Sequence, residues 1–166
     1  PETVVVQTDW FPEAEHGGIY ELLGADAISS KDTGATVGTF TYEGVDQGVQ
    51  LEIRAGGPAI GYSQVTAELY KDPSILLGFT STDEQVSHSG DDFPTVAVVA
   101  PFNINPQIIM WDPATYPDVK TIADLKATGA KVRYFGGTAY MDYFTSTGIL
   151  DPAQVDGGYD GTPANF

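Results

Sequence analysis

Short apolar runs, separated by polar and glycine-rich stretches, dominate the pattern of this chain. Residues 4–7 form a β-branched run that predicts a buried strand. Residues 49–53 alternate apolar and polar side chains, as a half-buried strand does. Four further stretches predict strands at residues 75–79, 95–100, 107–111 and 131–135.

Between these strands, apolar residues recur at helical spacing. Residues 14–24 place three apolar side chains on one helical face, although a glycine pair weakens a helix there. Pro58 suits the first position of a second helix, and apolar residues follow it at helical spacing. Ser81 and Glu84 have the spacing of a capping box for a short helix. Helices are also predicted at residues 121–125 and 138–147.

The predicted strands and helices alternate along most of the chain. This order favours an α/β fold with a mixed, mainly parallel sheet. Residues 25–48 are polar and glycine-rich, so we expect mostly loop there, with only residues 39–42 strand-like. A change in composition places a lobe boundary near residue 105, giving a first lobe over residues 1–105 and a second over 106–166. We expect the second lobe to be incomplete, because its last residues resemble the start of another βα unit.

The charge balance narrows the class of partner. The chain has 7 Lys and Arg residues against 23 Asp and Glu residues, a formal net charge of -16. Such a surface repels nucleic-acid phosphates and anionic membranes, and it is typical of a soluble exported protein. Cysteine is absent, which excludes disulfides, thiolate nucleophiles and cysteine-based metal sites. No apolar stretch reaches the roughly 18–20 residues of a membrane-spanning helix.

Residues suited to ligand contact gather where predicted strands end. In open α/β sheets, ligands bind outside the carboxyl ends of the strands. The first junction offers the carboxylates of Asp9 and Glu15, the indole of Trp10 and the imidazole of His16. The other junctions supply Gly57, Pro58 and Tyr62; Asp83; and Gly137, Thr138 and Tyr140.

These junctions leave the charge of the ligand open. Asp9, Glu15 and Asp83 would accept hydrogen bonds from a neutral or cationic ligand, whereas helix starts at Gly57 and Gly137 would favour an anionic group. Each feature also has a purely structural interpretation. A tryptophan at a strand end is more often packing than stacking on a ligand, and glycine pairs are usually turns. His16 alone is consistent with a capping or surface histidine.

Known catalytic motifs are missing. The Gly-x-Ser-x-Gly elbow, the dinucleotide-binding glycine motif and the phosphate-binding Gly-Lys-Ser/Thr loop do not occur. The two histidines lie far apart in the sequence and lack zinc-site spacing. We therefore expect no catalytic residue, no metal site and no cofactor.

Several motifs in order resemble a known family. The pattern Trp10-x-Pro12-x-x-x-His16 after an apolar strand resembles the start of ABC-transporter substrate-binding proteins of the nitrate, sulfonate and taurine group. It is also similar to thiamine-pyrimidine-precursor synthases and precursor-binding proteins, which share their fold. Residues 53–61, 135–141 and 159–163 continue the resemblance. It spans nearly the whole chain but only about the first half of a usual family member.

The resemblance implies a periplasmic-binding-protein-like fold of type 2, a three-layer α/β sandwich whose two lobes close on a small molecule. Relatives often hold a heteroaromatic ring at the position of Trp10. It further implies a non-enzymatic, monomeric full-length protein, periplasmic or extracellular and lipid-anchored in some forms, that delivers its solute to an ABC permease. Two alternatives stay open: a synthase-like enzyme using His16, whose relatives need a cysteine-rich segment that this chain lacks, and a sensor or interaction module.

Overall fold

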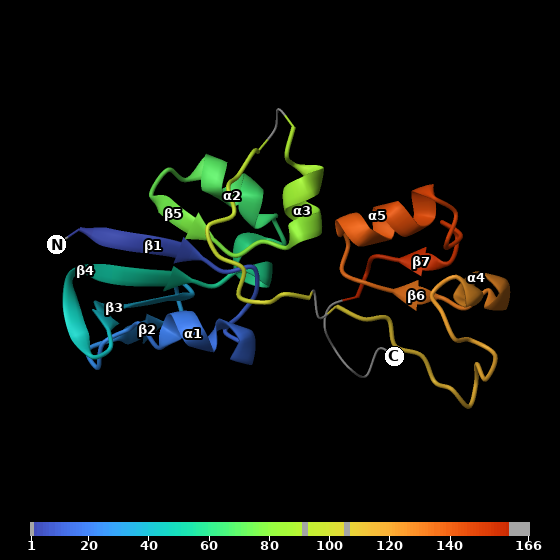
Figure 1. The fold of residues 1–166 in the computed structure, drawn as a ribbon, viewed down its shortest axis with the longest axis horizontal. Coiled ribbons are helices and arrows are strands. Elements are labelled where there is room, and N and C mark those ends of the chain that lie inside the picture. Colours follow the sequence, from blue (N-terminus) through green and yellow to red (C-terminus); the bar gives the residue numbers. More distant parts are fainter. Residues whose placement is uncertain (1, 91–92, 105–106, 160–166) are drawn as a thin grey trace. The chain divides into compact units, whose positions relative to one another are not determined.

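The computed structural model describes residues 2–90, 93–104 and 107–159 (Figure 1). Contacts divide the chain into two compact units, Pro1–Ala97 and Val98–Phe166, and each is described here by itself. The predicted lobe boundary at residues 105 and 106 lies outside the described residues, as does most of the motif at 159–163.

A five-stranded mixed sheet forms the first unit, which confirms an α/β fold (Figure 1). Its strand order is β2-β3-β4-β1-β5. Strand β1 is parallel to β4 and β5, whereas β2–β3 and β3–β4 are antiparallel pairs, so this sheet is not mainly parallel. The strands are β1 (Thr3–Gln7), β2 (Ile28–Ser30), β3 (Ala35–Tyr42), β4 (Val45–Arg54) and β5 (Ile75–Gly78).

The prediction of mostly loop over residues 25–48 is wrong, because this segment forms β2, β3 and the start of β4; its strand-like residues 39–42 are confirmed as part of β3. Strands β3 and β4 are joined by a two-residue turn between the paired residues Tyr42 and Val45. Glu43 and Gly44 both have positive φ, at 50° and 75°. Two left-handed residues in succession give the type I′ turn, whose twist matches that of the flanking strands.

The helices of the first unit are shorter than predicted. Residues 14–24 form a 3₁₀ helix, η1 (Ala14–His16), and one turn of α-helix, α1 (Gly17–Tyr20), because the following residues pair with β3 through the Leu23–Phe40 bridge. Half of the capping box predicted for the third helix, α3 (Thr82–Ser87), is formed: the Ser81 hydroxyl accepts a hydrogen bond from the N–H of Glu84, whereas the Glu84 carboxylate accepts hydrogen bonds from Thr66.

The helix predicted to begin at Pro58 is divided in two. A 3₁₀ helix, η2 (Gly57–Ile60), is followed by α2 (Val65–Lys71). Gly61 and Tyr62 between them have φ values of 64° and 60°, which no α-helix tolerates. The helical spacing of apolar residues therefore continues across a real break in the helix.

The buried core of the first unit lies on one face of its central strands. Val6 of β1 is directly opposite Ile53 of β4, and both are almost completely buried together with Leu51. Strand β5 forms an edge of the sheet, where Leu76 and Leu77 are 66% and 39% exposed. Burial at the centre thus holds β1 and β4 in fixed register up to their carboxyl ends.

In its described residues, the second unit packs two short strands and two short helices around a separate core. Strands β6 (Val132–Arg133) and β7 (Val155–Asp156) are parallel, and the helices are α4 (Asp124–Thr128) and α5 (Ala139–Ser146). The core residues are Val119, Leu125, Val132, Met141 and Leu150.

The strands predicted at residues 95–100 and 107–111 are not formed. In the described part of the chain no neighbouring strand pairs with either stretch, and Val96 and Ile108 are 85% and 76% exposed. Apolar composition alone does not make a strand, because the backbone also needs hydrogen-bond partners.

An ion pair ties the end of β4 to the residue after α2. The Arg54 guanidinium lies 2.7 Å from the Asp72 carboxylate. Hydrogen bonds from Ser74, reinforced by Arg54, lower the pKa of Asp72 from its ordinary 3.8 to about 2. A lowered pKa means that the carboxylate stabilises the fold above pH 3.8 and loses this effect as the pH falls toward about 2.

We therefore expect Asp72→Asn to be less stable than the wild type at neutral pH, with the difference disappearing between pH 3.8 and about 2. Urea denaturation across this pH range measures it. Asp32→Asn is the control, because the Asp32 side chain makes no hydrogen bond in the described part of the chain. A difference that persists undiminished at the lowest pH would contradict the prediction.

Candidate functional site

The carboxyl ends of β1, β4 and β5 lie at the same edge of the sheet, since all three strands are parallel. The chain leaves β1, adds strands on one side up to β4, and then crosses through α2 to β5 on the other side. The direction of strand addition thus reverses between β1 and β5. Such a reversal is where open α/β sheets bind ligands.

Thr8 fastens the loop after β1 to the loop after β4. It is completely buried, and its backbone N–H donates to the Arg54 carbonyl at 2.9 Å. Its hydroxyl donates to the Trp10 carbonyl at 2.7 Å, and the same carbonyl accepts the N–H of Gly56 at 2.9 Å. Because these bonds join the two loops by their backbones, the position of Trp10 is fixed by the sheet.

The indole of Trp10 lies against Gly57. A Cβ atom at Gly57 would come within 2.5 Å of the indole ring, and the φ of this glycine is 57°. At Gly56 a Cβ atom would meet the Thr8 carbonyl oxygen at 2.1 Å. Gly56 and Gly57, whose junction was predicted to contact a ligand, are therefore needed because the two loops approach each other too closely here for any larger residue.

Three aromatic side chains gather around this contact. The ring of Trp10 lies 6.0 Å from that of Tyr62 and 6.3 Å from that of Phe11, measured between centroids. Tyr62 and Phe11 are 56% and 46% exposed, and Trp10 is half-buried. Tyr62 also has the left-handed φ of 60°, a strained conformation of the kind that clusters at functional sites. We call Trp10, Phe11 and Tyr62 the aromatic cluster.

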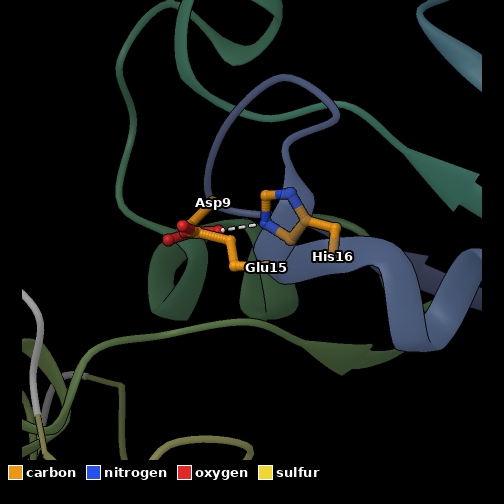
Figure 2. Close-up of side chains that lie close together, drawn as sticks. All are labelled: Asp9, Glu15 and His16. Carbon is orange, nitrogen blue, oxygen red and sulfur yellow. Dashed lines mark hydrogen bonds and ion pairs between the residues drawn. The ribbon is translucent and has the colours of Figure 1, made fainter.

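The side chains of Asp9, Glu15 and His16 lie close together (Figure 2). Asp9 directly precedes Trp10 of the aromatic cluster in the sequence. The Nε2 atom of His16 lies 2.9 Å from Oδ1 of Asp9. The His16 ring is completely buried, whereas the Asp9 side chain is 46% exposed. One potential ligand atom from each of the three residues lies within 4.8 Å of the others. These are the side chains that could hold a cation or a hydrogen-bond donor.

The other ring nitrogen of His16 faces the backbone. Nδ1 accepts a hydrogen bond from the N–H of Glu13 at 3.2 Å. The ring also lies edge-on to Phe79, with centroids 5.3 Å apart, so the loops after β1 and β5 touch at this histidine. His16 was predicted as a ligand contact; its ring is buried, and both of its nitrogens have partners within the chain.

The loop after β5 brings further carboxylates. Asp83 is half-buried, and its Oδ1 is a buried atom with no hydrogen-bond partner among the described residues. Glu84 accepts hydrogen bonds from both the N–H and the hydroxyl of Thr66, at 2.9 and 2.8 Å. Because Thr66 is in the first turn of α2, Glu84 neutralises the positive end of that helix.

The start of η2 at Gly57 and Pro58 offers few donors to an anion. Pro58 has no N–H, and the N–H of Gly56 already donates to the Trp10 carbonyl. Pro58 itself is exposed.

The predicted site residues of the second unit are adjacent at the start of α5. Gly137 has a φ of 82°, and Thr138 is the residue before the helix. The Thr138 hydroxyl is buried and has no hydrogen-bond partner within the described ranges. Tyr140 is half-buried and packs against Phe144 and the core of this unit.

Sequence reasoning missed two residues that build the site, Thr8 and Phe79. Glu84 was named in a junction and as the partner of Ser81 in a cap, but nothing in the sequence links it to Thr66. Thr8 carried a weak signal, because a small polar residue directly after a buried strand is well placed to close a turn.

Searches of family models, curated proteins and solved structures gave no match to this chain. Within the described residues, no helix is both long and apolar enough to cross a membrane.

Proposed function

We propose that this chain is the solute-binding component of an ABC importer, with the periplasmic-binding-protein-like fold of type 2, and that it captures a small, flat molecule outside the cytoplasm. The α/β class and the mixed sheet agree with this fold. The proposal includes delivery to a membrane permease and a monomeric full-length protein. It also gives Gly137, Thr138 and Tyr140 the role of ligand contacts from the second lobe.

One observation carries the proposal: the loop after β1, where strand addition reverses between β1 and β5, carries both the Asp9 carboxylate and two rings of the aromatic cluster, Trp10 and Phe11. The cluster offers apolar surface for a ring, and stacking on an aromatic side chain adds about 0.5–1.5 kcal/mol beyond burial. The carboxylates offer polar partners that fix the orientation of that ring. A binding site needs both.

The environment of His16 favours a receptor over a synthase-like enzyme. A residue that supplies atoms to a reaction must be reached by the other reactants, and this ring is completely buried. Both of its nitrogens are already engaged, one by Glu13 and one by Asp9. A sensor or interaction module would use the same strand ends, so the permease partner distinguishes it from a transport receptor.

Calorimetry and thermal-shift measurements with thiamine precursors, flavins, nucleobases, sulfonates and nitrate test the proposal. We expect one of these solutes to bind, and Trp10→Ala to weaken it about tenfold or more, because the ring loses both area and stacking. Tyr42→Ala is the matched control, since this aromatic residue is 59% exposed at the β3–β4 turn and should leave the affinity unchanged. Failure of every solute to bind, or release of a product, would overturn the receptor function.

A further inference from the structure

The stretch of chain after α3 leaves part of its backbone without partners. Residues 95–100, predicted as a strand, form neither a helix nor a strand (Figure 1). Among the described residues, none donates a hydrogen bond to the backbone of residues 96–100 or accepts one from it. The N–H and C=O groups of these residues are therefore left to water. We call residues 96–100 the open segment.

The side chains of the open segment are exposed on both sides of the chain. Val96, Val98 and Val99 are 85%, 73% and 79% exposed, and Ala97 and Ala100 are exposed as well. Successive side chains of an extended chain point to opposite sides, so the exposure of both Val98 and Val99 means that neither side is packed. Another protein can thus reach the open segment without unfolding any helix or strand.

Folded residues hold the chain on the N-terminal side of the open segment. The Tyr70 hydroxyl of α2 donates a hydrogen bond to the Pro94 carbonyl at 2.7 Å. The Gln85 amide of α3 donates a hydrogen bond to the Thr95 hydroxyl at 3.2 Å. The chain is therefore fixed to the first unit up to Thr95, and the open segment begins directly after it.

On its C-terminal side, the open segment leads into the second unit. Ile109 and Trp111 pack against the core of that unit. The boundary between the two compact units falls within the open segment, between Ala97 and Val98. Because each unit has its own buried core, a cut in the open segment passes between the cores and through neither of them.

The side chains of the open segment determine which kind of protease fits it. A protease binds its substrate as an extended chain, and the pocket for the residue before the cut bond sets the specificity. Residues 72–119 contain no Lys or Arg, so an enzyme that needs a basic side chain finds none here. The open segment contains only valine and alanine, which fit the small pocket of an elastase-type serine protease.

We propose that the open segment is a cleavage site for serine proteases with a small apolar specificity pocket, and that its cleavage divides the chain between its two compact units. Exposed connections with small side chains are the preferred sites of proteolytic nicking. Each cut consumes one water molecule. The C–N bond of the peptide breaks, the water oxygen bonds to the carbonyl carbon to give a carboxylate, and both water protons go to the nitrogen of the new N-terminus.

Limited digestion of the whole chain with elastase, followed by measurement of the intact fragment masses, tests the proposal. We expect the first cut to fall within the open segment, at a rate at least about tenfold above that of any other bond, because other bonds must first be exposed by local unfolding. Trypsin under the same conditions is the matched control. Its sites nearest the open segment are Lys71 and Lys120, so it should leave residues 72–119 in one piece.

A lysine introduced into the open segment separates accessibility from enzyme specificity. Val98→Lys should allow trypsin to cut after residue 98 at least about tenfold faster than after Lys71, whose side chain is also exposed but lies in α2. The substitution should leave the urea midpoint unchanged, because the valine side chain is exposed.

Three results would overturn the proposal. A first elastase cut outside the open segment would show that this segment is not the preferred site. Resistance of the wild type to elastase and of Val98→Lys to trypsin would show that the segment is covered, and loss of this resistance on dilution would identify a second copy as the cover. Rapid trypsin cleavage of Val98→Lys without elastase cleavage of the wild type would show an accessible segment that small-pocket proteases do not select.

Discussion

Gly56→Ala is expected to lower the free energy of unfolding by about 3 kcal/mol or more, since overpacking costs most where the obstructing atoms cannot move. The added methyl group would lie 2.1 Å from the Thr8 carbonyl oxygen and 2.5 Å from the Asp9 carbonyl carbon. Both are backbone atoms of the loop that Thr8 fastens to β4. Relief therefore requires the loops to separate, which breaks the bond between Gly56 N–H and the Trp10 carbonyl.

Urea denaturation followed by tryptophan fluorescence measures this loss. Gly18→Ala is the matched control, because a Cβ atom there meets nothing within 4 Å in a helical segment. Alanine should leave that position unchanged or more stable by up to about 1 kcal/mol. Equal stability of the two variants would show that the loops after β1 and β4 are not in the close contact described.

Ile53→Ala is expected to lower the free energy of unfolding by about 2–5 kcal/mol, the range measured when a buried aliphatic side chain is replaced by alanine. Ile53 is completely buried on β4 and pairs in register with Val6, which is 1% exposed. Strands β1 and β4 are held at the centre of the sheet, so little can collapse into the cavity. The variant should also lose solute affinity, because the same two strands carry Trp10 and Gly57 at their ends.

Ile28→Ala is the control for this second variant. Ile28 has the same side chain in a strand of the same sheet, but it is 74% exposed. Its substitution should change stability by no more than about 0.5 kcal/mol. Similar losses for both variants would mean that the core of the first unit is not centred on β1 and β4.

The strands around the site were predictable because their apolar patterns reflect burial. β1, β4 and β5 each combine a short apolar or alternating run with a polar end, and all three were predicted close to their observed positions. The β2–β3–β4 hairpins were not predictable in the same way. Glu43 stands where asparagine or aspartate usually signals a type I′ turn, so the turn was hidden.

The residues at the candidate site were largely predictable from the sequence, but the contacts between their side chains were not. The junctions named Asp9, Trp10, His16, Gly57 and Tyr62 because strand ends converge in an α/β sheet. The orientation of the His16 ring depends on Glu13 and Phe79, and the capping of α2 depends on Glu84. These contacts are set by tertiary packing, which leaves no regular spacing in the sequence.

The outer edge of β5 is the part of the first unit most suited to association between protein molecules in concentrated solution. Leu76 and Leu77 present apolar surface at an edge where, among the described residues, no further strand pairs with β5, and such an edge is a template for joining another strand. The formal charge of -16 keeps such encounters rare by mutual repulsion at low ionic strength. Added salt weakens that repulsion and leaves the leucines untouched. Added salt is therefore expected to lower the colloidal stability of this protein.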